Sequence, residues 1–285
     1  MTSDDVLSAL RLEPGSPVHL TDHAPAAKPV GPSSKSKAAK AMERIAPELD
    51  DLQEALYGEG VSGGRRRVLL VLQGMDTSGK GGTIRHAAGV LNPQGLHIAS
   101  FKKPTPTELE HHFLWRIRNQ LPAPGMIGIF DRSHYEDVLV VRVKELVPAT
   151  EWGKRFDEIN AFEAELATDG VALVKCFLHI SPQAQRERLL ARLDDPAKRW
   201  KYNPHDLETR AKWSAYQSAY ADALHRCGTA VAPWYVIPSD RKWYRNWAVA
   251  QLLLQTMREL APQYPAPSFD VEVERAKLLD ADPLG

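Results

Sequence analysis

Five nearly continuous apolar runs recur between Arg65 and Ile237 and alternate with segments of helical periodicity. Such runs are typical of strands that are covered on both faces of a parallel sheet. The alternation of strand and helix predicts an α/β protein, a three-layer α/β/α sandwich around that sheet. We expect the strands at 68–73, 97–101, 126–131, 171–180 and 231–237.

Capping residues mark several helix boundaries. Residues 105–108 (TPTE) form a capping box with proline at the first helical position. Ser181-Pro182 begins another helix, and Gly228 follows a long helix expected from about Pro204 to Cys227.

Pattern and composition divide the chain into three parts. Residues 1–40 are rich in Pro, Ala, Ser and Lys and lack apolar periodicity, which predicts a flexible N-terminal tail that could also lie along the body. An amphipathic helix follows and is expected to stop around Gly58 and Gly60. Residues 41–285 form the main domain, in which 182–227, mostly helical and rich in Arg, Lys and Trp, is expected to be a lid.

The overall composition narrows the class of function. The 285 residues carry 36 basic and 36 acidic side chains, and this zero net charge argues against a nucleic-acid binder. The sequence shows no membrane span and no apolar signal core, so we expect a cytoplasmic protein. Cys176 and Cys227 are expected to be reduced structural thiols rather than a disulfide or a zinc site.

Residues 74–80 (GMDTSGK) match the phosphate-loop pattern GxxxxGK between an apolar run and a helical segment at 83–91. Glycines let backbone N–H groups turn toward phosphate oxygens, the helix N-terminus adds partial positive charge, and Lys80 supplies a point charge. The alternative, a glycine-rich turn that binds nothing, fits this context less well. The expected phosphate contacts of the loop are Gly74, Thr77, Ser78, Gly79, Gly81 and Gly82.

The loop departs from the usual pattern at the metal position. Gly81 follows Lys80 where a Ser or Thr would hold magnesium, and Asp76 places a carboxylate inside the loop. A carboxylate beside phosphates is costly unless a divalent cation lies between them. Asp76 is therefore a candidate metal ligand, or a group that steers an acceptor phosphate; a turn-capping role remains open.

A second cluster of polar residues follows the third strand. Asp131 ends that strand where a second metal-binding acid would lie, and Arg132 can make a forked contact with phosphate. Ser133 and Glu136 match a capping box, so capping and a functional role are equally open for Glu136. His134 and Tyr135 could line the site or pack in the core.

Basic side chains gather near the expected site. Lys102 and Lys103 follow the second strand, and the lid is rich in cations, which together suggest a substrate with many phosphates. Trp200 and Trp234 could stack on a base or belong to the core. The lid cations are Arg186, Arg188, Arg192, Lys198, Arg199 and Lys201.

Four segments, GMDTSGKGG, FDRSHYEDVLVVRV, KRWKYNPHD and APWYVIPSDRKWYRN, resemble the polyphosphate kinase 2 family in family order, over about residues 40–262. The resemblance implies a P-loop kinase fold like that of thymidylate kinase, with a helical lid, and homodimers or homotetramers. It also implies reversible transfer of a terminal phosphate between inorganic polyphosphate and adenine, or also guanine, nucleotides. Magnesium would be the cofactor, with manganese as a substitute.

The resemblance also implies roles for individual residues. Asp76, Lys80, Asp131 and Arg132 match the family's catalytic positions, with Asp76, Asp131 and Glu136 as metal ligands. The sequence SHYED is similar to the class that accepts both AMP and ADP, with Glu136, His134 and Tyr135 on the nucleotide side. Lys102, Lys103, Arg192 and Arg199 would bind polyphosphate. An ATP-dependent nucleotide kinase on the same fold, and a non-catalytic binding protein, are the rival functions.

Overall fold

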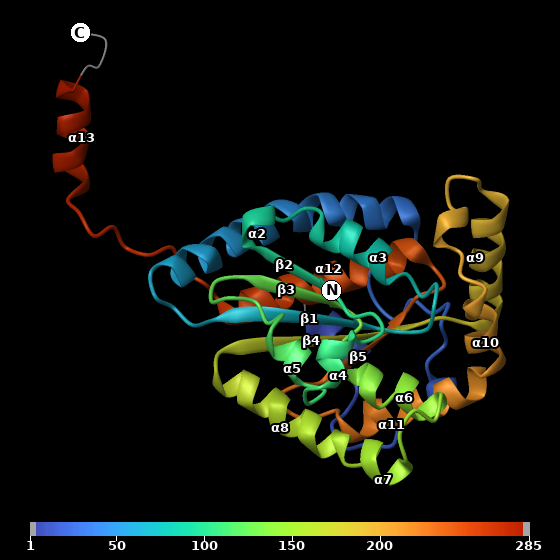
Figure 1. Ribbon diagram of the computed structural model, residues 1–285. Coiled ribbons are helices and arrows are strands. Elements are labelled where there is room, and N and C mark those ends of the chain that lie inside the picture. Colours follow the sequence, from blue (N-terminus) through green and yellow to red (C-terminus); the bar gives the residue numbers. More distant parts are fainter. Residues whose placement is uncertain (1–3, 282–285) are drawn as a thin grey trace.

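The computed structural model describes residues 4–281, and its centre is a parallel sheet of five strands (Figure 1). The strand order is β2-β3-β1-β4-β5, and every neighbouring pair is parallel. All five expected strands are present, with boundaries shifted by at most three residues. They are β1 (Arg67–Gln73), β2 (Leu96–Ser100), β3 (Ile127–Asp131), β4 (Val171–His179) and β5 (Trp234–Pro238).

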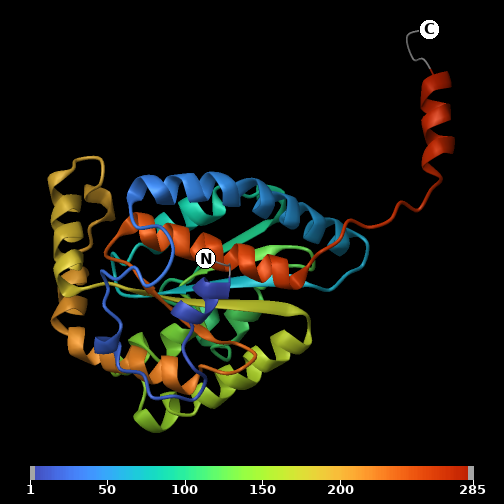
Figure 2. The same ribbon diagram turned by 180° about the vertical axis from the view of Figure 1, so that it is seen from behind.

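Both faces of the sheet are covered by helices. Along β1, Val68, Leu70 and Leu72 pack into one core and Leu69 and Val71 into the other, because successive side chains of a strand point to opposite faces. Helices α2 (Lys35–Val61) and α12 (Lys242–Leu260) cover the first face, whereas α8 (Arg155–Thr168) and α11 (Trp213–Arg226) cover the second. The three-layer sandwich is confirmed, and Figure 2 shows it from behind.

Helix α2 does not stop at its glycines. It continues to Val61, and Gly63 at φ 92° follows it. A Cβ on Gly60 would lie 2.5 Å from the Cα of Gly125, so this glycine allows two segments to approach closely. The helix therefore ends one residue beyond Gly60, close to the end expected around Gly58 and Gly60.

The described part of the N-terminal segment packs on the body, as the second of the two expectations for residues 1–40 had it, and does not form a flexible tail. Helix α1 (Asp4–Leu10) buries Val6 and Leu10, although the sequence around it has no long apolar period. The Leu12 N–H donates to the Trp234 carbonyl at 2.9 Å, and Arg11 bridges antiparallel to Tyr235. The segment thus covers part of the outer edge of β5, an edge that would otherwise expose unpaired backbone groups.

The expected lid region divides into two parts. Helices α9 (Pro182–Asp194) and α10 (His205–Ala211) project at one end of the sandwich (Figure 1), and Ser181 caps α9 by accepting from the Ala184 N–H as expected. The helix expected over 204–227 breaks at Lys212. Its second half, α11, belongs to the core and not to a lid.

The remaining elements are short. Thr105 and Glu108 form both bonds of the expected capping box of α4. Cys176 and Cys227 are buried free thiols, and no helix within residues 4–281 is long and apolar enough to cross a membrane. The short elements are η1 (Leu20–Asp22), α3 (Lys80–Thr83), η2 (Ile84–Ala88), η3 (Pro93–Gly95), α4 (Pro106–Leu109), α5 (Trp115–Arg118), η4 (His134–Asp137), α6 (Val140–Val143), α7 (Ala149–Trp152), η5 (Arg199–Lys201) and α13 (Val271–Asp280).

Candidate active site

The loop between β1 and α3 has the backbone conformation of an anion cradle. Gly74 and Gly79 have φ angles of 149° and 108°, which side chains disfavour. Thr77 also has a positive φ of 65°, an uncommon conformation for a residue with a Cβ. A Cβ on Gly74 would lie 2.7 Å from the Leu178 carbonyl oxygen, so the glycine also lets the loop approach β4.

Two arginines hold the loop from outside. Arg188 of α9 donates to the Thr77 carbonyl at 2.8 Å, and Arg245 of α12 donates to the Ser78 carbonyl at 2.9 Å. Burial, with Arg188 as a like charge, lowers the pKa of Arg245 to about 10. Because the two arginines bind these carbonyl groups on the outer side of the loop, the N–H groups in the first turn of α3 remain available for phosphate oxygens. Sequence reasoning counted Arg188 only as a lid cation and missed Arg245, since neither lies in a phosphate motif.

Lys80 lies at the centre of the site. Its Nζ donates to the Gly74 carbonyl at 2.7 Å, and its side chain is buried. Burial and then Arg132 lower the pKa of Lys80, while three carboxylates oppose this shift. These carboxylates belong to Asp131, Asp76 and Glu136.

The parallel register brings the second cluster to the loop. Asp131 pairs with Leu72 of β1 and with Ser100 of β2, so it ends β3 beside the start of the loop. Arg132 follows with φ 65°, and its Nη2 lies 3.2 Å from Oδ1 of Asp76. Burial opposes the charge on Arg132, but the nearby carboxylates outweigh it and raise the pKa on balance. The structure thus brings all four residues expected to be catalytic together.

Glu136 faces the loop and does not cap its own helix. The Ser133 Oγ accepts from the Tyr135 N–H at 3.3 Å, and no reciprocal capping bond from Glu136 is present. The Gln73 side chain lies between Glu136 and Ser133. Its amide nitrogen donates to Glu136 Oε1 and its amide oxygen accepts from the Ser133 hydroxyl, each at 3.1 Å. Burial raises the pKa of Glu136, while Arg132 and then Lys80 oppose the rise. Gln73, at the end of β1, was missed by sequence reasoning because a strand-end Gln has no pattern of its own.

His134 and Tyr135 lie in the core, although they were expected on the nucleotide side. Both side chains have an exposed fraction of 0%. Glu163 of α8 lies 3.1 Å from the His134 Nε2 and accepts from the Tyr135 hydroxyl at 2.7 Å. Lys175 of β4 donates to Glu163 at 2.6 Å and to Tyr135 at 2.8 Å. This buried network anchors η4 and offers no surface to a ligand in this conformation.

Helices α10 and α11 form the opposite wall. Burial raises the pKa of Asp206 and nearby Asp76 adds to the rise, so this α10 carboxylate lies close to the loop acid. Arg192 of α9 lies 3.4 Å from Asp206. Burial, followed by Glu136 and Asp76, raises the pKa of Tyr216 to about 12. Asp206 was quoted within a motif but not assigned a role, since a single Asp on a helix is usually a solvated residue.

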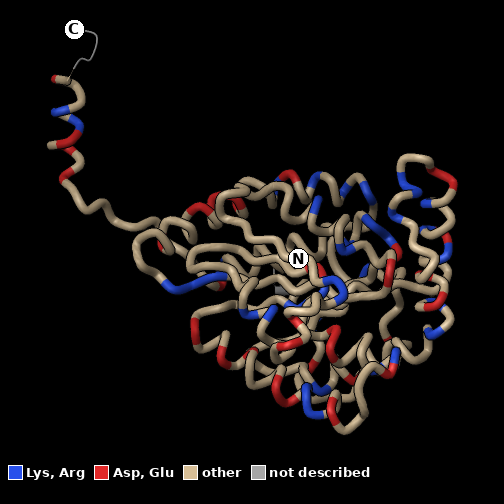
Figure 3. The backbone as a smooth tube through the Cα atoms, viewed as in Figure 1, with Lys and Arg blue, Asp and Glu red and all other residues tan. Residues whose placement is uncertain are grey.

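Three of the four residues expected to bind polyphosphate are exposed, and Arg192 is partly buried. Lys102 and Lys103 are exposed after β2, and Arg199 is exposed in η5, where its Nε donates to the Leu193 carbonyl. Figure 3 shows basic positions along the projecting lid helices. Trp200 is exposed next to Arg199, whereas Trp234 is a core residue.

Comparison with known proteins decides the family. The polyphosphate kinase 2 family model matches residues 32–265. The chain belongs to the polyphosphate kinase 2 family. It is 50% identical to the AMP/ADP-polyphosphate phosphotransferase of Meiothermus ruber, over 82% of this chain and 86% of that protein. It is 44% identical to the ADP-polyphosphate phosphotransferase of Rhodopseudomonas palustris, over 76% of this chain and 78% of that protein.

A solved structure agrees over the whole length. The crystal structure of polyphosphate kinase 2 from Arthrobacter aurescens superposes with a TM-score of 0.95 at 42% identity and covers 99% of both chains. The fold is therefore the P-loop kinase fold of the polyphosphate kinase 2 family, as the sequence resemblance implied.

The donor set of this polyphosphate kinase 2 site suits a hard cation that phosphates help to bind. Among residues 4–281, no three His, Cys, Asp or Glu side chains converge closely enough to hold an ion by themselves. Magnesium commonly takes one or two carboxylates, with phosphate and water oxygens completing the octahedron. Asp76, Asp131 and Glu136 supply carboxylate oxygens that all act on Lys80, so these residues fit a site that they would share with phosphate.

Proposed function

We propose that this chain transfers the terminal phosphate of inorganic polyphosphate to AMP and ADP, reversibly. One observation carries the proposal: Lys80, Arg132 and three carboxylates meet at the C-terminal edge of the sheet, beside a loop built to bind phosphate. Phosphoryl transfer needs positioned charges more than covalent catalysis, and this site provides them. The names of the relatives supply the donor and the acceptors.

The chemistry follows from these charges. An oxygen of the acceptor phosphate attacks the terminal phosphorus of polyphosphate, the bridging P–O bond breaks, and the shortened chain keeps the bond electrons as a phosphate oxyanion. Lys80 and Arg132 neutralise charge on the group in transfer, and the loop amides hold its oxygens. Lys102, Lys103, Arg192 and Arg199 bind the remainder of the polyphosphate along the margin of the site.

A divalent ion, which we propose to be magnesium with manganese as a substitute, would be held by Asp76 together with Asp131 or Glu136. When bound, it supplies charge neutralisation between donor and acceptor phosphates. Arg132 contacts Oδ1 of Asp76 at 3.2 Å in this structure, and binding of phosphate by Arg132 would release that oxygen to the ion.

Acceptance of both AMP and ADP is proposed to depend on Glu136. The Meiothermus relative is named for both nucleotides, whereas the Rhodopseudomonas relative is named for ADP. A carboxylate held by Gln73 at 3.1 Å can bind an ion beside the acceptor phosphate. The proposal also includes guanine nucleotides as substrates and assembly into a homodimer or homotetramer. We further propose a cytoplasmic location, without association with nucleic acid or membrane.

The decisive experiment supplies purified protein with polyphosphate and AMP, ADP, GMP or GDP in turn, with magnesium, and identifies the products. We expect ADP and ATP from the adenine nucleotides. A parallel reaction with ATP and AMP, without polyphosphate, tests the rival ATP-dependent kinase. Turnover with ATP as donor but none with polyphosphate would overturn the proposal, as would binding without turnover.

A further inference from the structure

Gln185 of α9 is a buried polar residue to which the site described above gives no role. Its exposed fraction is 0%, although α9 belongs to the part of the chain that projects from the sandwich (Figure 1). A buried amide without hydrogen-bond partners is costly, so its partners indicate what it does. Its Nε2 donates to the Asp76 carbonyl oxygen at 3.1 Å, and its Oε1 accepts from Nη1 of Arg210 on α10 at 3.0 Å.

The two partners fix the direction of the Gln185 amide. A guanidinium group only donates hydrogen bonds, and a carbonyl oxygen only accepts them. The amide oxygen therefore faces Arg210 and the amide nitrogen faces Asp76, because the reversed amide would place two oxygens against each other. Arg210 is itself held in place, since its Nη1 also donates to the Pro182 carbonyl at 2.7 Å in the first turn of α9. Arg210 thus keeps the amide in the orientation that binds the loop.

Gln185 extends the row of contacts by which α9 holds the phosphate loop. Arg188 lies one turn further along the same side of the helix, because residues three apart are neighbours on a helix surface. It donates to the carbonyl oxygens of Thr77 and Ser78 at 2.8 and 3.2 Å. The two side chains of α9 therefore bind three consecutive carbonyl groups, those of residues 76–78. A site for phosphate has to keep carbonyl oxygens turned away from the anion, and α9 does so here.

Asp76 is the residue of this row whose side chain is needed for the ion. An aspartate side chain is short, so the place of its carboxylate is set closely by the backbone that carries it. The bond from Gln185 holds that backbone at its carbonyl group. Helix α10 reaches the same residue twice: through Arg210, and through Asp206 one turn earlier, the carboxylate that lies close to Asp76.

We propose that Gln185 and Arg210 are positioning residues that place Asp76 for binding of the divalent ion. Arg210 orients the Gln185 amide, and the amide holds the loop at Asp76, so that α9 and α10 together set the geometry of the ion site. Both residues act through Asp76 and not on the phosphates themselves. The inference rests on the proposed function in one respect, the role of Asp76 as a ligand of the ion.

The first test compares the magnesium dependence of turnover in full-length variants. Gln185→Met removes both hydrogen bonds, whereas Gln185→Glu keeps the size of the side chain and an acceptor for Arg210 but loses the donor to Asp76. We expect each to raise the magnesium concentration at half-maximal rate about 10- to 100-fold, as loss of a contact that orients a metal ligand does elsewhere. The KM for ADP at saturating magnesium should change much less.

Gln183→Met, at an exposed position of the same helix, is the matched control and should behave as wild type. An equal magnesium dependence in wild type and both Gln185 variants overturns the proposal. A fall in kcat with an unchanged magnesium dependence also overturns it, because that result would give Gln185 a structural role only. If Gln185→Met does not fold, as judged by circular dichroism and melting temperature, Gln185→Glu decides the question.

A double-variant cycle tests whether Arg210 acts through Gln185. Arg210→Met should raise the magnesium requirement, because the amide loses the partner that orients it. The variant with both Arg210→Met and Gln185→Met should be no worse than Gln185→Met alone, since the two residues lie on one path. Effects that multiply would show that Arg210 acts independently of Gln185. An Arg210→Met variant that behaves as wild type would exclude Arg210 from the positioning role.

A binding measurement separates this inference from the proposed function. Tripolyphosphate titrated calorimetrically in the presence of magnesium reports on the loop and the ion site, whichever donor the enzyme uses. Gln185→Met should bind it at least about tenfold more weakly than wild type and Gln183→Met. If wild type uses ATP and not polyphosphate, the proposed donor is wrong, yet this comparison still tests Gln185. Equal affinities of wild type and Gln185→Met overturn the inference and leave the donor untouched.

Discussion

At the scale of single residues, the site depends on Lys80 and Asp76. Burial lowers the pKa of Lys80, and the surrounding acids oppose this shift only in part; they hold the lysine beside the site where phosphate charge develops. We expect Lys80→Ala and Asp76→Asn each to lower kcat at least about 10²- to 10³-fold, as removal of a transition-state charge contact does elsewhere. Steady-state assays with polyphosphate and ADP measure this, and an unchanged melting temperature shows an intact fold. Substantial remaining turnover in either variant would contradict the assigned roles.

Buried charge is the second residue-scale feature. Lys175 and Glu163 have exposed fractions of 0% and are 2.6 Å apart. Lys175→Met would leave the Glu163 carboxylate buried without its cation, which costs about 3–5 kcal/mol. Urea denaturation measures this loss, and Lys154→Met, at a surface position, is the control. The double variant Lys175→Met with Glu163→Leu should recover much of the loss, whereas a single-variant loss below about 1 kcal/mol would refute the argument.

The residues that sequence predicted and those that it missed differ in a physical way. Asp76, Lys80 and Asp131 could be found because local backbone geometry, a glycine loop or a strand end, dictates their position. Gln73 and Asp206 could not, because each acquires its role from a segment distant in sequence. His134 and Tyr135 show the reverse error: adjacency to Arg132 suggested the site, but the buried acceptor on α8 holds them in the core.

At the scale of elements, the strands were predictable because each is covered on both faces, and burial leaves a clear apolar run. The helix boundaries were harder to predict from the sequence. Gly60 of α2 allows close packing against Gly125, a role that only the tertiary structure reveals. The N-terminal segment looked like a tail because it packs through scattered apolar residues along an irregular path.

The end of β4 gives an element-scale prediction for pH. Burial and then the neighbouring His23 lower the pKa of His179 from 6.5 to about 4, while Asp240 opposes this shift. Between these values the unfolded chain binds the proton and the folded chain does not, so stability falls as the pH drops from about 6.5 to about 4. The loss reaches about 3 kcal/mol at most, and above the ordinary histidine pKa this group contributes none.

Urea denaturation at pH 7.5, 6.0 and 5.0 measures that slope. His179→Phe should remove the part of the pH dependence of stability that this imidazole causes. His86→Gln, at an exposed position, should leave the pH dependence unchanged. An identical pH slope in wild type and His179→Phe would mean that other groups, and not His179, determine acid stability.

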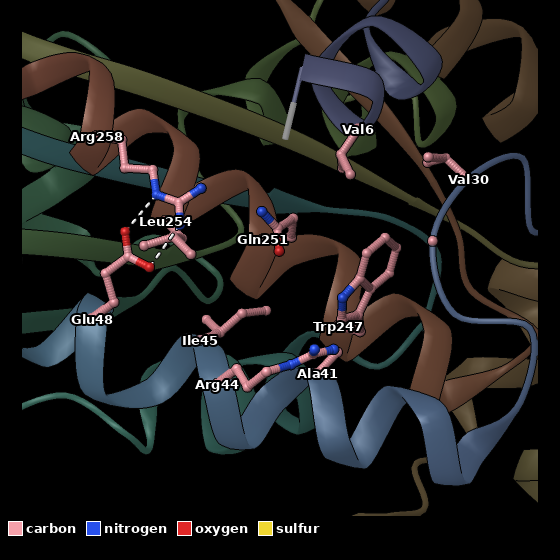
Figure 4. Close-up of a pocket in the computed structure, with 11 residues that line it drawn as sticks. Val6, Val30, Ala41, Arg44, Ile45, Glu48, Trp247, Gln251, Leu254 and Arg258 are labelled. Atoms are coloured by element: carbon pink, nitrogen blue, oxygen red, sulfur yellow. Dashed lines mark hydrogen bonds and ion pairs between the residues drawn. The ribbon is translucent and has the colours of Figure 1, made fainter. Parts of the chain in front are cut away.

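At the scale of the whole molecule, a family core carries two attachments. The core matches the family model over residues 32–265. The N-terminal segment precedes it, and α13 follows it. The N-terminal segment contributes Val6 and Val30 to the apolar cluster on the face formed by α2 and α12 (Figure 4). Leu278 and Leu279 of α13, by contrast, are exposed.

Removal of residues 1–31 tests whether the N-terminal segment belongs to the folded unit. The deletion uncovers the outer edge of β5, where the Leu12 N–H now bonds the Trp234 carbonyl, and exposes apolar surface beneath Val6 and Leu10. Burial of one such side chain contributes about 1.5–3 kcal/mol, so we expect a clearly lower melting temperature, and aggregation on heating through the free edge. Leu10→Asp in the full chain should reproduce part of the loss, while Leu279→Asp, at an exposed position of α13, should leave the melting temperature nearly unchanged. A truncated protein as stable and as soluble as wild type would show that the segment only lies on the body. The active-site loop is expected to keep its conformation in the truncated protein, because Arg188 of α9 and Arg245 of α12, which hold it, both lie outside the deleted segment.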